Sequence, residues 1–140
     1  MSASKPSFSG VWAAYRSDLH ACNIELPNQC AVRMSRALID AGWSRDVFKS
    51  TRYPGKVCPH GYARGAQDLA AFLANVWGGR NLGWNAPGST PKDVKGRKGL
   101  VAFMRIPGFG GQGHIDLWDG SATKTGDYWD SETIWFWDLS

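Results

Sequence analysis

The hydrophobic pattern of this sequence changes once, near residue 98, from a helical to an extended spacing. Before that point apolar residues recur at intervals of three and four, which is the spacing of one face of a helix. After it, short apolar runs are separated by glycine-containing turns, which is typical of β-strands. Helices first and an antiparallel sheet afterwards predict an α+β fold, with N-terminal helices packed on the sheet.

Three helices are predicted in the first part of the chain. The first lies within residues 8–19, where Ser7 or Ser9 can cap its start. The second runs from about residue 28 to residue 41 and ends at Gly42, because glycine readily adopts the backbone conformation that follows a helix. The third covers residues 69–77.

Three strands are predicted in the second part, at residues 100–106, 114–118 and 132–139. The first of these is mostly apolar and fits a strand that is buried on both faces. Two stretches lack a sustained period, residues 43–63 and 80–97, and both are expected to be irregular loops. The longer loop, residues 43–63, is long enough to fold over a cleft.

The size and composition of the chain indicate one globular domain, residues 1–140. The chain has 140 residues, 17 Gly and 8 Trp, with a net charge of +4. No stretch is long and apolar enough for a membrane helix, and the first ten residues lack the apolar core of a secretory signal, so membrane insertion is not expected. Basic residues are scattered and carry no recognised motif, so nucleic-acid binding is not expected either.

Three cysteines cannot all pair with one another, so at least one is a free thiol. A bridge between Cys22 and Cys58 would leave Cys30 free. A zinc site built from Cys22, Cys58, His20 and His60 is the alternative, but their spacing matches none of the common zinc fingers. We therefore expect neither a metal nor a cofactor.

Cys30 and His114 are the residues best placed for chemistry. Cys30 lies at the start of the second predicted helix, where unpaired backbone N–H groups favour a thiolate. His114 shares a strand face with Asp116 and Trp118, and a glycine-rich turn precedes it. A buried structural cysteine explains Cys30 equally well. A helix-start cysteine combined with a strand histidine is nevertheless the arrangement of papain-like cysteine enzymes.

The sequence also resembles a known family, the amidase effectors of bacterial type VI secretion systems, family 4. The matching segments are PSFSGVWAAYR, QCAVRMS, GYARGAQDLAAFL and GRKGLVAFMRIPGFGGQGHIDLWDGS, in that order along the chain. The resemblance implies a papain-like fold and cleavage of the amide bond between γ-D-glutamate and meso-diaminopimelate in peptidoglycan.

The resemblance also implies a role for individual residues. Cys30 matches the family's nucleophile and His114 its general base. The family's acid lies after the strand that ends in LWDGS, where this chain reads ATKTGDYWD, so Asp127 is the first choice, Asp130 the second and Asp116 the third. The residues expected to bind substrate are Asn28, Gln29, Gly113, Asp116 and Trp118.

The expected partners are bacterial peptidoglycan and an immunity protein that protects the producing cell. The protein is expected to be made in the cytoplasm without a signal peptide and exported to the cell wall of a target bacterium. The alternative function is a non-catalytic glycan-binding module, in which Trp84, Trp118 and Trp129 stack on sugars and Cys30 is structural.

Overall fold

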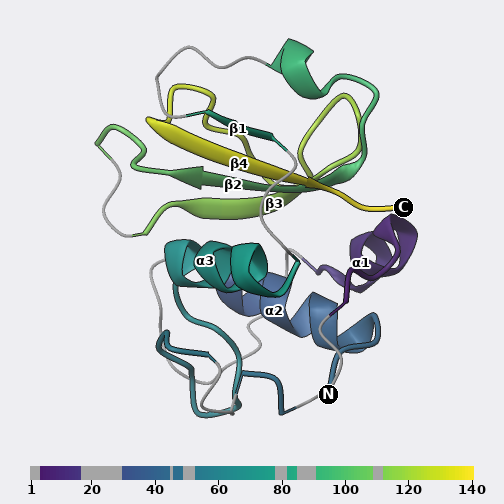
Figure 1. Cartoon of the computed structure of the whole chain (residues 1–140), viewed down its shortest axis with the longest axis vertical. Helices are drawn as coiled ribbons and strands as arrows, with labels where there is room; N and C mark the ends of the chain where they lie inside the picture. The colour runs from purple at the N-terminus through teal and green to yellow at the C-terminus, as the bar shows by residue number, and fades with distance from the viewer. Residues whose placement is uncertain are drawn as a thin grey trace.

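A computed structural model describes residues 4–16, 30–44, 46–48, 53–77, 82–84, 91–108 and 112–140, and the structural statements below concern these residues. Helices come first and strands second (Figure 1). The elements are α1 (Phe8–Ala14), α2 (Cys30–Asp40), α3 (Ala66–Val76), β1 (Leu82–Trp84), the 3-10 helix η1 (Pro91–Val94), β2 (Gly99–Met104), β3 (His114–Trp118) and β4 (Thr133–Asp138).

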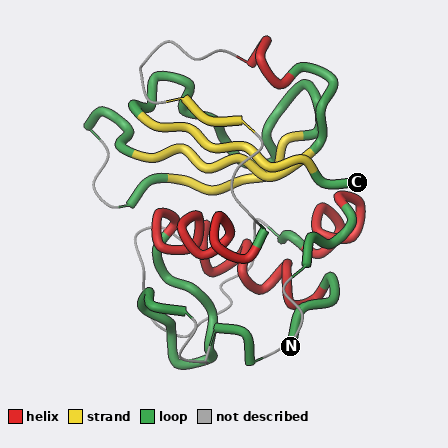
Figure 2. Tube along the Cα trace, in the orientation of Figure 1, coloured by secondary structure: helices red, strands yellow, loops and turns green. Residues whose placement is uncertain are grey.

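The strands form one antiparallel sheet in the order β1-β4-β2-β3. Helices α1, α2 and α3 lie on one side of this sheet and η1 lies on the other (Figures 1 and 2). In the register of β2 with β3, Phe103 lies opposite His114 and Val101 lies opposite Asp116. Within the described sheet β3 is therefore an edge strand that brings His114 close to the helices.

The apolar side chains form two clusters, one on each face of the sheet. The helix side holds Leu100, Ala102 and Trp137 together with the inner faces of the three helices. The opposite side holds Phe103 and Trp118 together with Val94 of η1. Since both faces of β2 are covered, all of its residues are buried, as the apolar run predicted.

Helix ends follow the local sequence signals. The Ser7 side chain accepts a hydrogen bond from the Gly10 N–H and caps α1. Gly42 has a φ of 136°, and the backbone N–H groups of Gly42 and Trp43 bond to carbonyls of the last turn of α2. The predicted end of α2 is thereby confirmed. Helix α1 is shorter than predicted, because Tyr15 already has an extended backbone with a ψ of 113°.

The described part of the long loop after α2 packs beneath the helices. Val57 and Ala63 form an isolated antiparallel bridge, and the Ala63 N–H donates to the Ser35 hydroxyl of α2 at 3.0 Å. Figure 1 shows this segment on the side of α2 and α3 that faces away from the sheet. Within the described residues, no helix is long and apolar enough to cross a membrane.

Candidate active site

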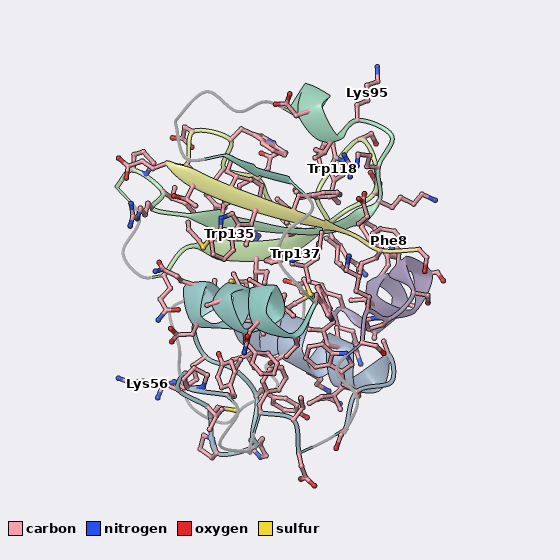
Figure 3. All side chains as sticks on the ribbon, in the orientation of Figure 1. Phe8, Lys56, Lys95, Trp118, Trp135 and Trp137 are labelled. Carbon is pink, nitrogen blue, oxygen red and sulfur yellow. The ribbon has the colours of Figure 1, made fainter. Side chains whose placement is uncertain are left out.

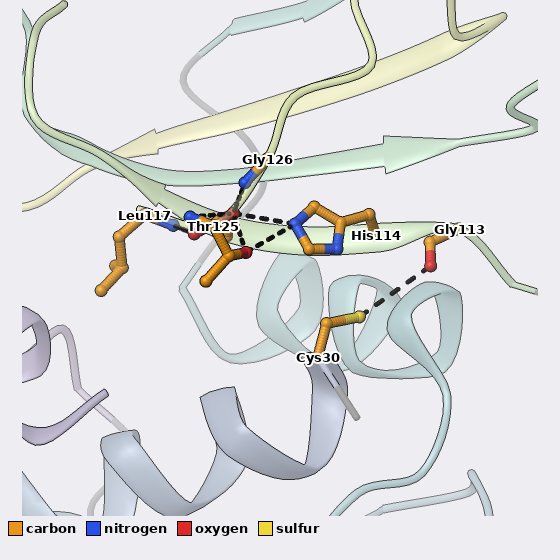
Figure 4. Close-up of polar contacts among 7 residues, drawn as sticks. Cys30, Gly113, His114, Leu117, Thr125 and Gly126 are labelled. Atoms are coloured by element: carbon orange, nitrogen blue, oxygen red, sulfur yellow. Dashed lines mark hydrogen bonds and ion pairs between the residues drawn. The ribbon is translucent and has the colours of Figure 1, made fainter. Parts of the chain in front are cut away.

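Cys30 is the first residue of α2, at the point where this helix approaches the edge strand β3 (Figure 4). Cys30 is not part of a disulfide, and the residue is 4% exposed. The Sγ atom donates a hydrogen bond to the Gly113 carbonyl oxygen at 3.9 Å. The thiol at the start of α2 therefore lies beside the start of the strand that carries His114.

Gly113 is required at this position by the backbone. Its φ is 110°, and a Cβ atom there would lie 2.2 Å from the Phe103 carbonyl oxygen. The preceding residue, Gln112, exchanges two hydrogen bonds with Asp68 in the first turn of α3, at 2.9 and 3.0 Å. The start of β3 is therefore fixed both to its neighbour strand and to α3, which fixes the position of His114.

The His114 ring lies between Cys30 and Asp116. Its Nε2 atom is 2.8 Å from Asp116 Oδ2, and the ring edge that carries the other nitrogen faces Cys30 (Figure 4). The Phe103 ring stacks on the His114 ring with the centroids 6.3 Å apart, and Tyr128 contacts it edge-on with the centroids 5.4 Å apart. These contacts hold the imidazole in one orientation, with one nitrogen for the thiol and one for the carboxylate.

Asp116 is fully buried and accepts hydrogen bonds at both carboxylate oxygens. Oδ1 accepts from the Leu117 N–H at 2.8 Å. Oδ2 accepts from the Thr125 hydroxyl at 2.5 Å and from the N–H groups of Thr125 and Gly126 at 3.0 Å each, besides the contact with His114. A buried carboxylate with this many donors is held ionised and in a single orientation.

The first choice of acid, Asp127, does not contact His114. Asp116, the third choice, is the carboxylate beside the imidazole, while Asp127 and Asp130 are exposed. The physical reason is the path of the loop after β3, which turns back so that Thr125, rather than an acidic residue, reaches His114, with Oγ1 3.2 Å from Nε2. Asp116 is also unavailable to bind substrate, because its side chain is fully buried.

Trp118, expected to bind substrate, lies instead in the core. Its side chain is 1% exposed, its indole N–H donates to the Val94 carbonyl at 2.9 Å, and its ring contacts Trp129. Figure 3 shows it in the layer between the sheet and η1. The prediction failed because strand alternation identifies a common face without telling whether that face is covered.

Of the other residues expected to bind substrate, Asn28 and Gln29 lie outside the described residues, and Gly113 remains a predicted contact.

Ionisation of the histidine and the carboxylate is coupled. Burial alone would lower the pKa of His114, but the hydrogen bonds to Asp116 and Cys30 and the charges of both groups outweigh burial and raise that pKa to about 9. Burial would raise the pKa of Asp116, but the bonds from His114 and Thr125 lower it below the usual range. An imidazolium held against a carboxylate is therefore the stable form near neutral pH.

Thr125, Gly126 and Lys124 are functional candidates that sequence reasoning missed. Thr125 and Gly126 supply three of the hydrogen bonds on Asp116. The Lys124 ammonium donates to the backbone carbonyls of Trp12 and Tyr15 at the end of α1. No local pattern signals these contacts, since each depends on where the loop after β3 meets another element.

Cys58 is disulfide-bonded, whereas Cys30 is not. This is the state expected if Cys58 pairs with Cys22, which itself lies outside the described residues. A disulfide sulfur is not a thiolate, so Cys58 cannot serve as a ligand in the alternative zinc site. Among the described residues, no cluster of three or more histidine, cysteine or acidic side chains is arranged to hold a metal ion.

A thiol at the start of a helix, packed against a histidine at the start of an antiparallel strand, places this α+β structure among the papain-like folds. Residues 26–137 match the model of the family described as type VI secretion system (T6SS), amidase effector protein 4. The chain belongs to this family of antibacterial peptidoglycan amidase effectors. Comparison with curated protein sequences gave no significant match.

Solved structures of the same family have the same fold. The type VI effector Tae4 from Enterobacter cloacae superimposes with a TM-score of 0.75 at 21% identity, with all of both chains covered. The Tae4 chain of the effector–immunity complex Tae4-Tai4 from Salmonella Typhimurium gives a TM-score of 0.75 at 23% identity, covering 97% of this chain and 99% of that one.

Proposed function

We propose that residues 1–140 form one cysteine amidase domain that cleaves the γ-D-glutamyl–meso-diaminopimelate bond of peptidoglycan stem peptides. In this proposal Cys30 is the nucleophile, His114 is the general base and acid, and Asp116 orients the imidazole. The observation that carries the proposal is the position of the His114 ring, which contacts Asp116 through Nε2 and faces the Cys30 thiol with its other edge.

The first half of the reaction is acylation. With the Cys30 proton already held on His114 as the imidazolium, the Cys30 thiolate attacks the γ-glutamyl carbonyl carbon. In this step the Cys30 N–H at the helix start stabilises the oxyanion. The imidazolium then donates its proton to the diaminopimelate nitrogen, the C–N bond breaks and the amine leaves. A thioester between Cys30 and the γ-glutamyl group remains.

The second half is hydrolysis of that thioester. His114, now neutral, removes a proton from water, which attacks the thioester carbonyl and releases the γ-carboxyl group. The proton stays on His114, which restores the imidazolium beside the Cys30 thiolate. Asp116 keeps the imidazole in the tautomer that presents its other nitrogen to the thiol, and its negative charge stabilises the imidazolium in both halves.

Family membership supports the biological role that we propose for this activity. The protein would be delivered by a type VI secretion system into a competing bacterium, where it weakens the cell wall. Solved relatives occur as effector–immunity complexes, Tae4 with Tai4. We propose that an immunity protein likewise binds this chain in the producing cell and blocks access to Cys30.

Digestion of purified diaminopimelate-type peptidoglycan tests the proposal. Wild-type protein and Cys30→Ala are incubated with the same sacculi, and the soluble products are separated and identified by mass. The expected result is new γ-glutamyl carboxyl ends and free diaminopimelate amines with wild type only. Cleavage by Cys30→Ala would exclude the proposed nucleophile, and cleavage at another amide would exclude the proposed bond.

The non-catalytic module is tested in the same experiment. If neither protein releases products while both are folded and sediment with the sacculi, the chain binds the wall without cutting it. The burial of Trp118 removes one of the three tryptophans on which that alternative depends.

A further inference from the structure

The loop after β3 carries the donors that hold Asp116, so whatever fixes this loop also affects His114. The first half of the loop is fixed locally. Asp119 Oδ1 accepts from the N–H groups of Ser121 and Ala122 at 2.9 and 2.8 Å, and the Lys124 N–H donates to the Leu117 carbonyl at 3.0 Å. These bonds close the turn, and none of them joins Thr125 or Gly126 to the helices.

Lys124 supplies an anchor of this kind through its side chain. Its Nζ atom donates to the carbonyl oxygens of Trp12 and Tyr15, the latter at 2.8 Å. The ammonium also lies 4.8 Å from the centre of the Trp12 ring and 5.8 Å from that of Tyr15. Helix α1 has no basic residue in its own last turn, so Lys124 provides the cation that the carbonyls at this helix end favour.

Partly burying the Lys124 ammonium costs free energy, which indicates that its contact with the end of α1 is specific. Burial lowers the pKa of Lys124, although the charge of Asp116 acts in the opposite direction. By contrast, Lys95 and Lys56 are exposed on the surface (Figure 3). Lys124 instead connects the loop after β3 to α1, two segments that are far apart in sequence. It directly precedes Thr125, which binds Asp116.

We propose that Lys124 is a positioning residue for the hydrolysis: by binding the end of α1 it holds Thr125 and Gly126 on the Asp116 carboxylate, and so keeps that carboxylate aligned with His114. The inference rests on the proposed roles of Cys30, His114 and Asp116. Helix α1 thereby contributes to the active site indirectly, through its contact with Lys124.

Several groups face the carboxylate and the imidazole, and all contribute to their titration. Asp116 is faced by His114 of its own strand, by Lys124 and Thr125 of the loop, and by Tyr15, whose pKa is raised by burial and by the charges of Asp116 and Cys30. His114 is also faced by Cys30 of α2. Arg33 of α2 acts on Tyr15 through its charge.

The test is the substitution Lys124→Met, assayed with soluble stem peptides over a range of pH. We expect kcat to fall by about 10- to 100-fold with KM within about twofold of wild type, because the residue does not contact substrate. The pH above which kcat/KM declines should also fall, since a carboxylate no longer aligned on Nε2 cannot keep the imidazolium protonated. Loss of a nearby positive charge alone would raise that pH, so the direction separates positioning from charge.

The matched controls are Lys124→Arg and Lys95→Met. The arginine retains the charge and the donors and should restore most of the lost kcat, and the exposed Lys95 should be replaceable without effect. If Lys124→Met does not fold, Lys124→Gln, which keeps a donor without the charge, is measured with the same expectations.

The inference is overturned if the folded Lys124 variant retains wild-type kcat and an unchanged basic limit. It is also overturned if the basic limit rises. Failure of the proposed function is recognised separately in the peptidoglycan digestion, where Cys30→Ala retains activity, wild type cleaves another amide, or neither protein releases products.

Discussion

His114 Nε2 and Asp116 Oδ2 lie 2.8 Å apart although the two residues are only two positions apart on the same strand. Alternate residues of a strand project from the same face, so both side chains reach the same side of β3. The strand that carries the proposed base therefore also carries the carboxylate that orients it. The loop after β3 contributes hydrogen-bond donors instead of the acid.

Replacing Asp116 should impair the reaction far more than replacing Asp127. We expect Asp116→Asn to lower kcat by roughly 10²- to 10⁴-fold, because an amide cannot stabilise the imidazolium or fix its tautomer. Asp127→Asn should stay within about twofold of wild type, since Asp127 is exposed and does not contact His114. Steady-state assays with one stem peptide measure both. The reverse order of effects would restore Asp127 as the acid.

The stability of the protein should depend on pH through His114. Its pKa rises from 6.5 to about 9 on folding, so its protonation stabilises the folded state fully below about pH 6.5, and this contribution is lost as the pH rises through 9. The contribution is at most about 3 kcal/mol. Urea unfolding of wild type and His114→Gln should show a difference in unfolding free energy that shrinks between pH 6.5 and 9. A constant difference would contradict the coupling.

Trp118 should matter for stability and not for substrate binding. Trp118→Phe removes the indole donor to the Val94 carbonyl and part of a fully buried side chain, so we expect a loss of about 1–3 kcal/mol in unfolding free energy. The KM of the folded variant should be unchanged. Denaturant melts and steady-state kinetics on the same preparation separate the two effects, and a raised KM with normal stability would return Trp118 to the substrate site.

The disulfide at Cys58 should stabilise the segment beneath α2 and α3. Cys58→Ser is expected to lower the unfolding free energy by about 2–4 kcal/mol, because the cross-link restricts the unfolded chain. Wild type in reductant should show the same loss. Cys30→Ser, which removes the free thiol, is the control and should remain sensitive to reductant. If reductant leaves the wild-type melt unchanged, the bridge does not stabilise the fold.

Several parts of the fold were predictable because they depend on nearby residues. The end of α2 follows from Gly42, which can adopt a positive φ, and the three strands β2, β3 and β4 follow from runs with a period of two or no polar interruption. The short strand β1 and the 3-10 helix η1 were not predicted. Three residues of strand carry no usable period, and β1 is identified only by its pairing with β4.

The sequence alone determined that Cys30 lies at a helix start and His114 at a strand start, because helix and strand positions are set by local hydrophobic spacing and turn residues. Only the tertiary structure decided that Asp116 is the carboxylate beside His114, that Trp118 is covered, and that Lys124 ties the loop to α1. The reason is physical. A strand's alternation says which side chains share a face. The burial of that face and the path of a loop depend instead on packing between distant segments, such as those of Lys124 and Trp12, which are 112 residues apart.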